Sequence, residues 1–348
     1  MRFIGGLVAL AVIIAGGWFA YNIIPASGVF TRLKPQLVNE CRRVDVFPGT
    51  EDVTIDPSTQ TAFISADDRR ATFAGAPVDG GIYTLSLDGS DKVVKVSPDN
   101  FTDFHPHGIS LFLPGDGAKR LFVINHTEED GDRVEIFDVG YANNLIHVES
   151  VSFPAMSSPN DIVAVGPRSF YVTNDRGYKS GLMSTLEAWL ALPFSSLAYY
   201  DGQHGRIVAK HLTYANGVNT SMDGATVYVS EFLRRRIDLF SRDHKTGALA
   251  KITSFPTGAG PDNIEVDKDG ALWIAGHPKV FSFLRYARDA SIPSPSVVMK
   301  IDPETGKRKN VFVDTQGTLN ASSVGAVWDD QLIVGSVFDD HVMVCPLK

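Results

Sequence analysis

Short apolar runs recur in pairs along this chain, and each pair has the same order of polar and apolar positions. A polar residue or pair opens one apolar run, a turn follows, and a second apolar run begins. The first runs are EDVTI from residue 51, HGISL from 107, NDIVAV from 160, NGVN from 216, DNIEV from 262 and SSVGAV from 322. The second runs are AFIS from 62, LFVINH from 121, FYVTND from 170, VYVSE from 227, LWIAGH from 272 and LIVGS from 332. Short strands repeated about every 50 residues predict an all-β chain, a β-propeller with six four-stranded blades.

The N-terminal segment has a different pattern. Residues 3–24 carry no charge, and as a helix they span about 33 Å, which is enough to cross the core of a bilayer. We therefore expect residues 1–25 to form a transmembrane signal anchor, with residues 26–40 as a linker and residues 41–348 as the propeller. The alternative is a signal peptide cleaved near Ala26. In both cases the propeller is exported.

A helical period interrupts the strands once. Apolar residues at helical spacing predict an amphipathic helix over about residues 180–192, before Pro193; they are Leu182, Met183, Leu186, Trp189 and Leu190. A helix that simply packs on the propeller is the alternative to one that contacts lipid.

Polar residues that open the first runs are expected to meet at one mouth of the propeller channel, because radial symmetry brings equivalent positions together. Setting His107 aside, five of them supply oxygen donors: Glu51, Asn160, Asn216, Asp262 and Asn263. Several carboxylate and carboxamide oxygens without sulfur suit calcium. The alternative is that Asn, Asp and Gly only initiate strands at turns, but five copies on one rim favour a metal site.

Composition narrows the class of protein. With 348 residues and 44% apolar positions, the chain can form one large all-β domain. A net charge of -8, with no basic cluster longer than Arg234-Arg235-Arg236, argues against a nucleic-acid partner. The oligomeric state is left open.

The two cysteines stand at the two ends of the predicted ring. Cys41 precedes the first repeat and Cys345 lies near the C-terminus, so ring closure brings them together. A disulfide between them fits an oxidising compartment and contributes about 4 to 5 kcal/mol in the chain-entropy model. Two unpaired buried thiols are the alternative.

From Cys41 to Cys345 the chain resembles the serum paraoxonase family of calcium-dependent arylesterases and lactonases. The stretches that carry the resemblance are GTEDVTI from residue 49, HPHGIS from 105, VINH from 123, SPNDIVAVG from 158, YANGVN from 214, PDNIEV from 261 and AGHP from 275. Arg176 departs from it, since some members have histidine there.

The resemblance implies a site, residue by residue, with two calcium ions. Glu51, Asn160, Asn216, Asp262 and Asn263 match ligands of a catalytic calcium. Asp52, Asp161 and the carbonyl of Ile109 match a structural calcium. His107 and His126 match a histidine dyad, and His277, Tyr214 and Phe281 match or adjoin substrate-pocket positions. The resemblance also implies that the helix at residues 180–192 covers the site.

The function expected from these residues is calcium-dependent hydrolysis of lactones and aryl esters. His107 removes a proton from water and His126 orients it, although a carboxylate near the metal is an alternative base. Two other functions stay open: a non-catalytic exported propeller that serves as a binding scaffold, and an enzyme like gluconolactonase or strictosidine synthase. The expected partners are a small ester or lactone and a membrane bound through the N-terminal helix.

Overall fold

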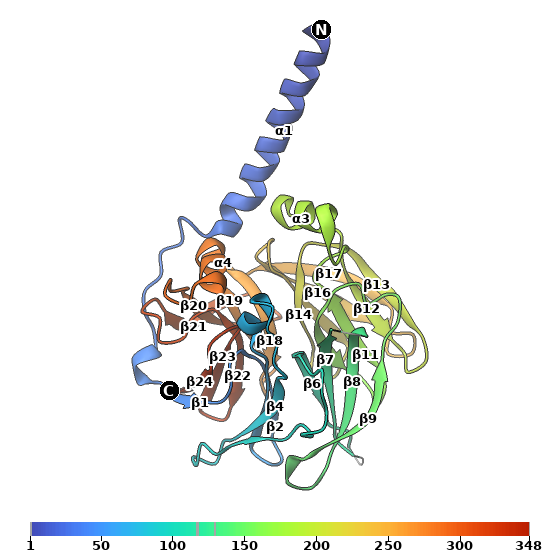
Figure 1. Cartoon of the computed structure of the whole chain (residues 1–348), viewed down its shortest axis with the longest axis vertical. Helices are drawn as coiled ribbons and strands as arrows, with labels where there is room; N and C mark the ends of the chain where they lie inside the picture. Colours follow the sequence, from blue (N-terminus) through green and yellow to red (C-terminus); the bar gives the residue numbers. More distant parts are fainter. Residues whose placement is uncertain (1, 116–117, 129, 348) are drawn as a thin grey trace.

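A computed structural model describes residues 2–115, 118–128 and 130–347, and it confirms the six-bladed propeller. Six antiparallel sheets of four strands each surround a central axis (Figure 1). Within each of blades 1 to 5 the strands are hydrogen-bonded in chain order, so each of these five blades is a meander. The predicted runs form the two innermost strands of each blade.

The strands of each blade run from the axis outward. Blade 1 contains β2 (Thr50–Asp56), β3 (Thr61–Ala66), β4 (Gly81–Ser86) and β5 (Val93–Lys95). Blade 2 contains β6 (Pro106–Phe112), β7 (Arg120–Thr127), β8 (Gly131–Val139) and β9 (Leu145–Val151). Blade 3 contains β10 (Pro159–Ala164), β11 (Phe170–Asn174), β12 (Ser195–Tyr200) and β13 (Gly205–Leu212). Blade 4 contains β14 (Ala215–Thr220), β15 (Thr226–Glu231), β16 (Arg236–Arg242) and β17 (Leu249–Pro256). Blade 5 contains β18 (Gly260–Val266), β19 (Leu272–His277), β20 (Ser296–Ile301) and β21 (Arg308–Asp314).

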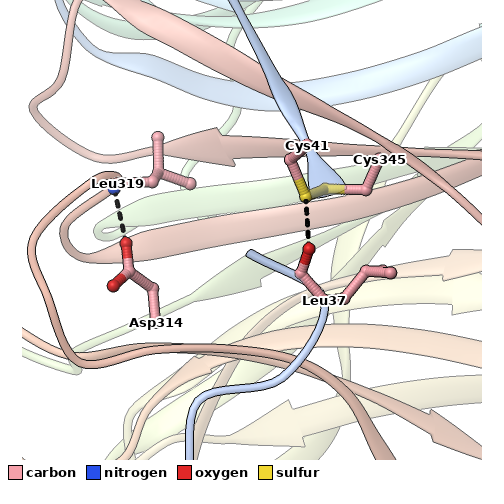
Figure 2. Close-up of a disulfide and its surroundings, with 5 residues drawn as sticks. All are labelled: Leu37, Cys41, Asp314, Leu319 and Cys345. Carbon is pink, nitrogen blue, oxygen red and sulfur yellow. Dashed lines mark hydrogen bonds between the residues drawn. A yellow bond between two sulfur atoms is a disulfide. The ribbon is translucent and has the colours of Figure 1, made fainter. Parts of the chain in front are cut away.

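Blade 6 closes the ring with strands from both ends of the chain. Its inner strands are β22 (Ser322–Trp328), β23 (Gln331–Ser336) and β24 (His341–Pro346), and its outer strand is β1 (Arg42–Asp45). β1 pairs with β24 from Arg42 opposite Val344 to Asp45 opposite His341. The predicted disulfide is present beside this pairing, where it joins Cys41 to Cys345 across 304 residues (Figure 2).

The hydrophobic core lies between the blades. Val53 and Ile64 of blade 1 pack against Val324 and Ile333 of blade 6, and comparable clusters fill the other five interfaces. A blade with two apolar faces cannot bury both alone, so each sheet is stabilised by its two neighbours. The innermost strands contact one another around the whole ring, and this fixes the mouth of the channel.

Helices gather at one end of the propeller (Figure 1). They are α1 (Arg2–Ser27), α2 (Arg69–Phe73), α3 (Gly181–Leu190) and α4 (Val280–Arg288), with short 3₁₀ turns η1 (Val38–Glu40) and η2 (Tyr141–Asn143) elsewhere. α3 confirms the predicted helix, whereas α2 and α4 were not predicted from the sequence. α1 projects away from the blades, and it contacts α3 and α4.

The segment between α1 and β1 packs against the propeller. Gln36 forms an isolated bridge with Val313 of β21, and Val38 is buried. The division of the chain at residues 25 and 40 stays a prediction.

Candidate active site

Each inner strand carries an irregularity where its polar pair stands. In all six blades the pairing of the first two strands shifts at that point, for example between Thr50 and Asp52 and between Pro159 and Ile162. Such a β-bulge re-aims the side chains beside it. The polar residues therefore leave the alternation of the strand and face the channel mouth, which simple strand periodicity does not predict.

The five predicted donors of the catalytic calcium are all buried at this mouth. Four of them keep a buried oxygen without any hydrogen-bond partner: Glu51 Oε2, Asn160 Oδ1, Asn216 Oδ1 and Asn263 Oδ1. A buried polar atom left unpaired costs about 1 to 3 kcal/mol, so four on one rim require a common explanation. A cation with several oxygen ligands satisfies all four, and the residues therefore fit calcium. In the described residues no three His, Cys, Asp or Glu side chains are grouped to hold a metal, so the site depends on the asparagine oxygens.

Hydroxyl groups from neighbouring strands hold the backbone of these donors. Thr173 Oγ1 donates to the carbonyl of Asn216 at 2.6 Å, and Ser230 Oγ donates to that of Asp262 at 2.8 Å. Ser323 Oγ donates to the carbonyl of Glu51 at 2.5 Å. The repeat pattern does not indicate these residues, whose signal is a small hydroxyl side chain inside an otherwise apolar strand.

Glycine follows two of the mouth residues because the inner strands nearly touch. A Cβ on Gly217 would lie 2.4 Å from the carbonyl oxygen of Asp262, and one on Gly108 would lie 2.6 Å from Cα of Asp161. Both contacts are shorter than any side chain tolerates. The glycines in HGIS and NGVN therefore allow adjacent blades to bring their donors together.

The two carboxylates of the mouth differ in their surroundings. Burial alone would raise the pKa of Glu51, but His107 and Arg69 lower it below its usual value. Burial raises the pKa of Asp262, which His277 opposes through a contact of 2.8 Å between Nε2 and Asp262 Oδ2. Arg69 Nη2 lies 4.0 Å from Glu51 Oε2. The site thus already contains one fixed positive charge beside its carboxylates.

Asp52 and Asp161 lie deeper along the channel and join neighbouring blades. Asp52 Oδ2 accepts from Ile109 N at 2.8 Å, and Asp161 Oδ2 accepts from Val218 N at 2.6 Å. A cavity of about 180 Å³ adjoins both carboxylates and Ile109. Burial, followed by the charge of the neighbouring carboxylate, raises the pKa of each aspartate well above its usual value. Two buried acids this close are stabilised by a cation between them.

The predicted histidine dyad is assembled in blade 2. His107 of β6 and His126 of β7 face each other with 2.8 Å between His107 Nδ1 and His126 Nε2. The other nitrogen of His107, Nε2, lies 3.5 Å from Glu51 Oε1. The dyad therefore touches the donor set directly.

A pocket of about 890 Å³ lies over the mouth and the dyad, and three helices form part of its walls. Its walls include Thr72 and Phe73 of α2, Trp189 of α3, and Phe281 and Leu284 of α4. The last turn of α1 also contributes, through Ile23, Ala26 and Ser27. One polar end with apolar walls is typical of a site that binds a small, mostly apolar molecule.

The remaining pocket candidates have distinct roles. Tyr214 and Phe281 line the pocket, and burial raises the pKa of the Tyr214 hydroxyl. His277 is almost fully buried, its ring centroid lies 4.1 Å from that of Phe283 in a tilted arrangement, and its Nε2 contacts Asp262 Oδ2.

His105 lies inside the protein, although a histidine next to a proline is easily taken for a surface residue. Its side chain is buried against Asp67, at 2.9 Å, and its backbone N donates to Asn125 Oδ1 at 2.8 Å. The hydrogen bond with Asp67 raises the pKa of His105. A preceding aromatic residue and a following proline gave no sign of this internal ion pair.

This fold and this site define an enzyme of the propeller class. The chain belongs to the arylesterase family: the family model described as Arylesterase matches residues 46–347. It is therefore a hydrolase. It is 32% identical over 304 residues to serum paraoxonase/arylesterase 1 of Homo sapiens, covering 83% of this chain and 84% of that one. It is 30% identical over 309 residues to serum paraoxonase/arylesterase 2 of Homo sapiens, covering 86% of each.

Solved structures support the fold. A putative gluconolactonase matches with a TM-score of 0.57 and 17% identity, over 89% of this chain and 94% of that one. The calcium-binding protein regucalcin of Agrobacterium tumefaciens matches with a TM-score of 0.55 and 14% identity, over 90% and 94%. At these identities the likeness shows a shared propeller only.

Proposed function

We propose that this chain hydrolyses lactones and aryl esters in a calcium-dependent reaction at the channel mouth. The observation that carries the proposal is the set of four unpartnered buried oxygens, which lies under an apolar pocket and beside a histidine dyad. The relatives named paraoxonase and arylesterase support the ester substrates, and the gluconolactonase name of a structural neighbour agrees with lactones.

Glu51, Asn160, Asn216, Asp262 and Asn263 would hold the catalytic calcium. When bound, it supplies a positive charge that polarises the substrate carbonyl and stabilises the oxyanion. The set contains two carboxylates and three carboxamides, so a single divalent ion neutralises its formal charge. Asp262 is kept in position by His277.

The chain's own residues carry the proton. His107 Nε2 is the ring nitrogen that faces Glu51 and the mouth, so it accepts a proton from a water held there. The oxygen of that water forms a bond to the carbonyl carbon, and the bond from this carbon to the alkoxide or phenoxide oxygen breaks. The proton on His107 then passes to the leaving oxygen. His126 keeps the ring of His107 oriented throughout.

A second calcium is proposed between Asp52, Asp161 and the carbonyl of Ile109. These groups come from β2, β10 and β6, so an ion among them links three blades. Burial and mutual repulsion raise the pKa of both aspartates, and a cation between them would offset the cost of their charges, which supports this second ion.

We also propose that α1 anchors the enzyme in a membrane with the propeller outside the cytoplasm. Gly5–Ser27 is the one helix in the described residues that is long and apolar enough to cross a bilayer. The disulfide agrees with an exported domain. Cleavage after the helix would remove the pocket residues Ile23 and Ala26, which favours a retained anchor.

The test is a panel of lactones and aryl esters, assayed with the detergent-solubilised full chain in calcium and after chelation. Hydrolysis that requires calcium, with two ions per chain by elemental analysis, is expected. Activity that persists in chelator with no bound calcium would overturn the calcium assignment, and a protein inert to the whole panel with calcium bound would overturn the substrate class.

A further inference from the structure

A third side chain continues the histidine dyad into the protein. On the side of His126 away from His107, the ring nitrogen Nδ1 lies 2.8 Å from Asp132 Oδ1. Asp132 stands on β8, directly opposite His126 in the pairing of β7 with β8. Its other oxygen, Oδ2, accepts from Lys179 Nζ at 2.7 Å. The polar chain therefore runs from Glu51 through both histidines to Asp132 and Lys179.

The acceptor at the end of this chain determines where each proton lies. An ionised carboxylate only accepts hydrogen bonds, so Nδ1 of His126 carries its hydrogen toward Asp132. In a neutral ring the other nitrogen, Nε2, then has a free lone pair and accepts from His107 Nδ1. That leaves the lone pair of His107 on Nε2, the atom that faces Glu51 and the channel mouth.

We propose that Asp132, held by Lys179, is the positioning residue that sets the tautomer of both histidines and so presents His107 Nε2 as the base. The proposal rests on the proposed function, because it needs His107 to accept the proton of water. Asp132 does not itself line the pocket, and His126 is the pocket residue that its carboxylate contacts, so its effect on the site passes through His126.

The surroundings of Asp132 favour this role. Its side chain is only 7% exposed, and its two oxygens are divided between one histidine and one lysine. Although burial alone would raise it, hydrogen bonds from His126 and Lys179 lower the pKa of Asp132 to about 2, so the carboxylate is ionised in any assay near neutral pH. Desolvation lowers the pKa of His126, which agrees with a neutral ring.

Lys179 makes the prediction for one substitution specific. In Asp132→Asn the new amide has one acceptor, its oxygen. Because Lys179 can only donate, this oxygen is the atom of the amide that faces Lys179. The amide NH₂ then faces His126 Nδ1 and requires a lone pair there. Both rings must adopt the opposite tautomer, and His107 Nε2 carries a hydrogen where water should lose one. Asparagine thus keeps the shape of the side chain but reverses the proton positions.

The experiment combines kinetics with a spectroscopic readout on the full chain in detergent with calcium. Asp132→Asn is expected to lower kcat for a lactone by about 10²-fold or more, with KM changed by less than about 3-fold, since tautomer control acts on proton transfer and not on binding. Histidine-selective ¹⁵N spectra should show His126 protonated on Nδ1 in the parent and on Nε2 in Asp132→Asn. Adding Lys179→Met frees the asparagine to rotate, so part of the lost kcat should return.

Asp130→Asn is the matched control. Asp130 lies in the turn before the same strand, carries the same charge, pairs with Arg133 and has a side chain that is 73% exposed. It should leave kcat and the spectra unchanged. An equal loss in Asp130→Asn, or a parent His126 protonated on Nε2, would overturn the proposal.

A double-mutant cycle distinguishes the positioning role of Asp132 from the role of His107 as the base. If Asp132 acts only through the dyad, Asp132→Asn adds no further loss in a His107→Gln background. A large loss of kcat for His107→Gln with none for Asp132→Asn would refute the positioning role of Asp132 and leave His107 as the base. No loss of kcat for His107→Gln would refute the role of His107 as the base, whatever the effect of Asp132→Asn.

Discussion

His277 Nε2 lies 2.8 Å from Asp262 Oδ2 in blade 5, and both side chains are buried at the channel mouth. The two residues come from the paired strands β18 and β19, so the blade itself determines their contact. A donor-set carboxylate that is oriented by a buried histidine is an arrangement typical of a metal site, where the partner of a ligand affects affinity as much as geometry.

Replacing His277 should therefore weaken calcium binding rather than substrate binding. His277→Leu removes the partner of Asp262, and we expect the calcium concentration for half-maximal activity to rise by about 10- to 100-fold. Titrating activity with calcium at a saturating substrate concentration measures this. Phe281→Leu is the control, because Phe281 lines the pocket without contacting Asp262; it should change KM and leave the calcium requirement as it was.

Substitutions in the calcium donor set and in the histidine dyad should have different effects on hydrolysis. Asp262→Ala removes a charged donor and should abolish hydrolysis of every substrate, together with one bound calcium. His107→Gln keeps the donors and should lower lactone hydrolysis by about 10²- to 10⁴-fold, with a smaller loss for aryl esters that have good leaving groups. Steady-state kinetics and elemental analysis distinguish the two. Full lactonase activity in His107→Gln would assign the dyad to packing.

Removing calcium should also destabilise the fold. Asp52 and Asp161 repel each other when both are ionised, and each spans to a neighbouring inner strand. We expect chelation to lower the melting temperature, and the Asp52→Asn variant to respond less to chelation because one of the repelling charges is gone. Calorimetry with and without chelator is the measurement. A melting temperature indifferent to calcium in the parent would contradict the second ion.

The blades and the mouth were predictable because their information is local and repeated. A polar pair at the start of each apolar run identified Glu51, Asn160 and Asp262, and ring symmetry placed them together. The helices α2 and α4 could not be predicted because each has at most nine residues, which is too short for a helical period to be recognised. Their stability depends on contacts with other parts of the fold. Asp132 was missed for a similar reason, since its pairing with Lys179 joins strand β8 to the segment before α3, which is distant in sequence. Strand alternation also missed the bulges, which depend on backbone pairing.

The disulfide should matter more for stability than for activity. The disulfide joins Cys41, just before β1, to Cys345 of β24 (Figure 2), and neither cysteine lines the pocket over the mouth. The double variant Cys41→Ser with Cys345→Ser should lose on the order of 5 kcal/mol at most, because the bridge closes a very long loop. Urea unfolding measures the loss, and kcat at low temperature should stay close to that of the parent. A large drop in kcat in a folded variant would show that closure also shapes the site.

Stability should depend on pH through Asp132 in a direction that can be stated. Its pKa is about 2 in the folded protein against an ordinary value of 3.8, so the folded state favours the ionised form more than the unfolded state does. The contribution is fully present above about pH 4 and disappears as the pH falls toward 2; it amounts to about 2 kcal/mol at neutral pH. Asp132→Asn should thus be less stable than the parent at pH 7, and the difference should shrink below pH 4. Urea unfolding of both proteins at each pH isolates this residue, because the other carboxylates titrate alike in the two chains. A difference that stays constant from pH 7 to pH 2.5, or one equalled by Asp130→Asn, would mean that His126 and Lys179 do not stabilise the charge of Asp132.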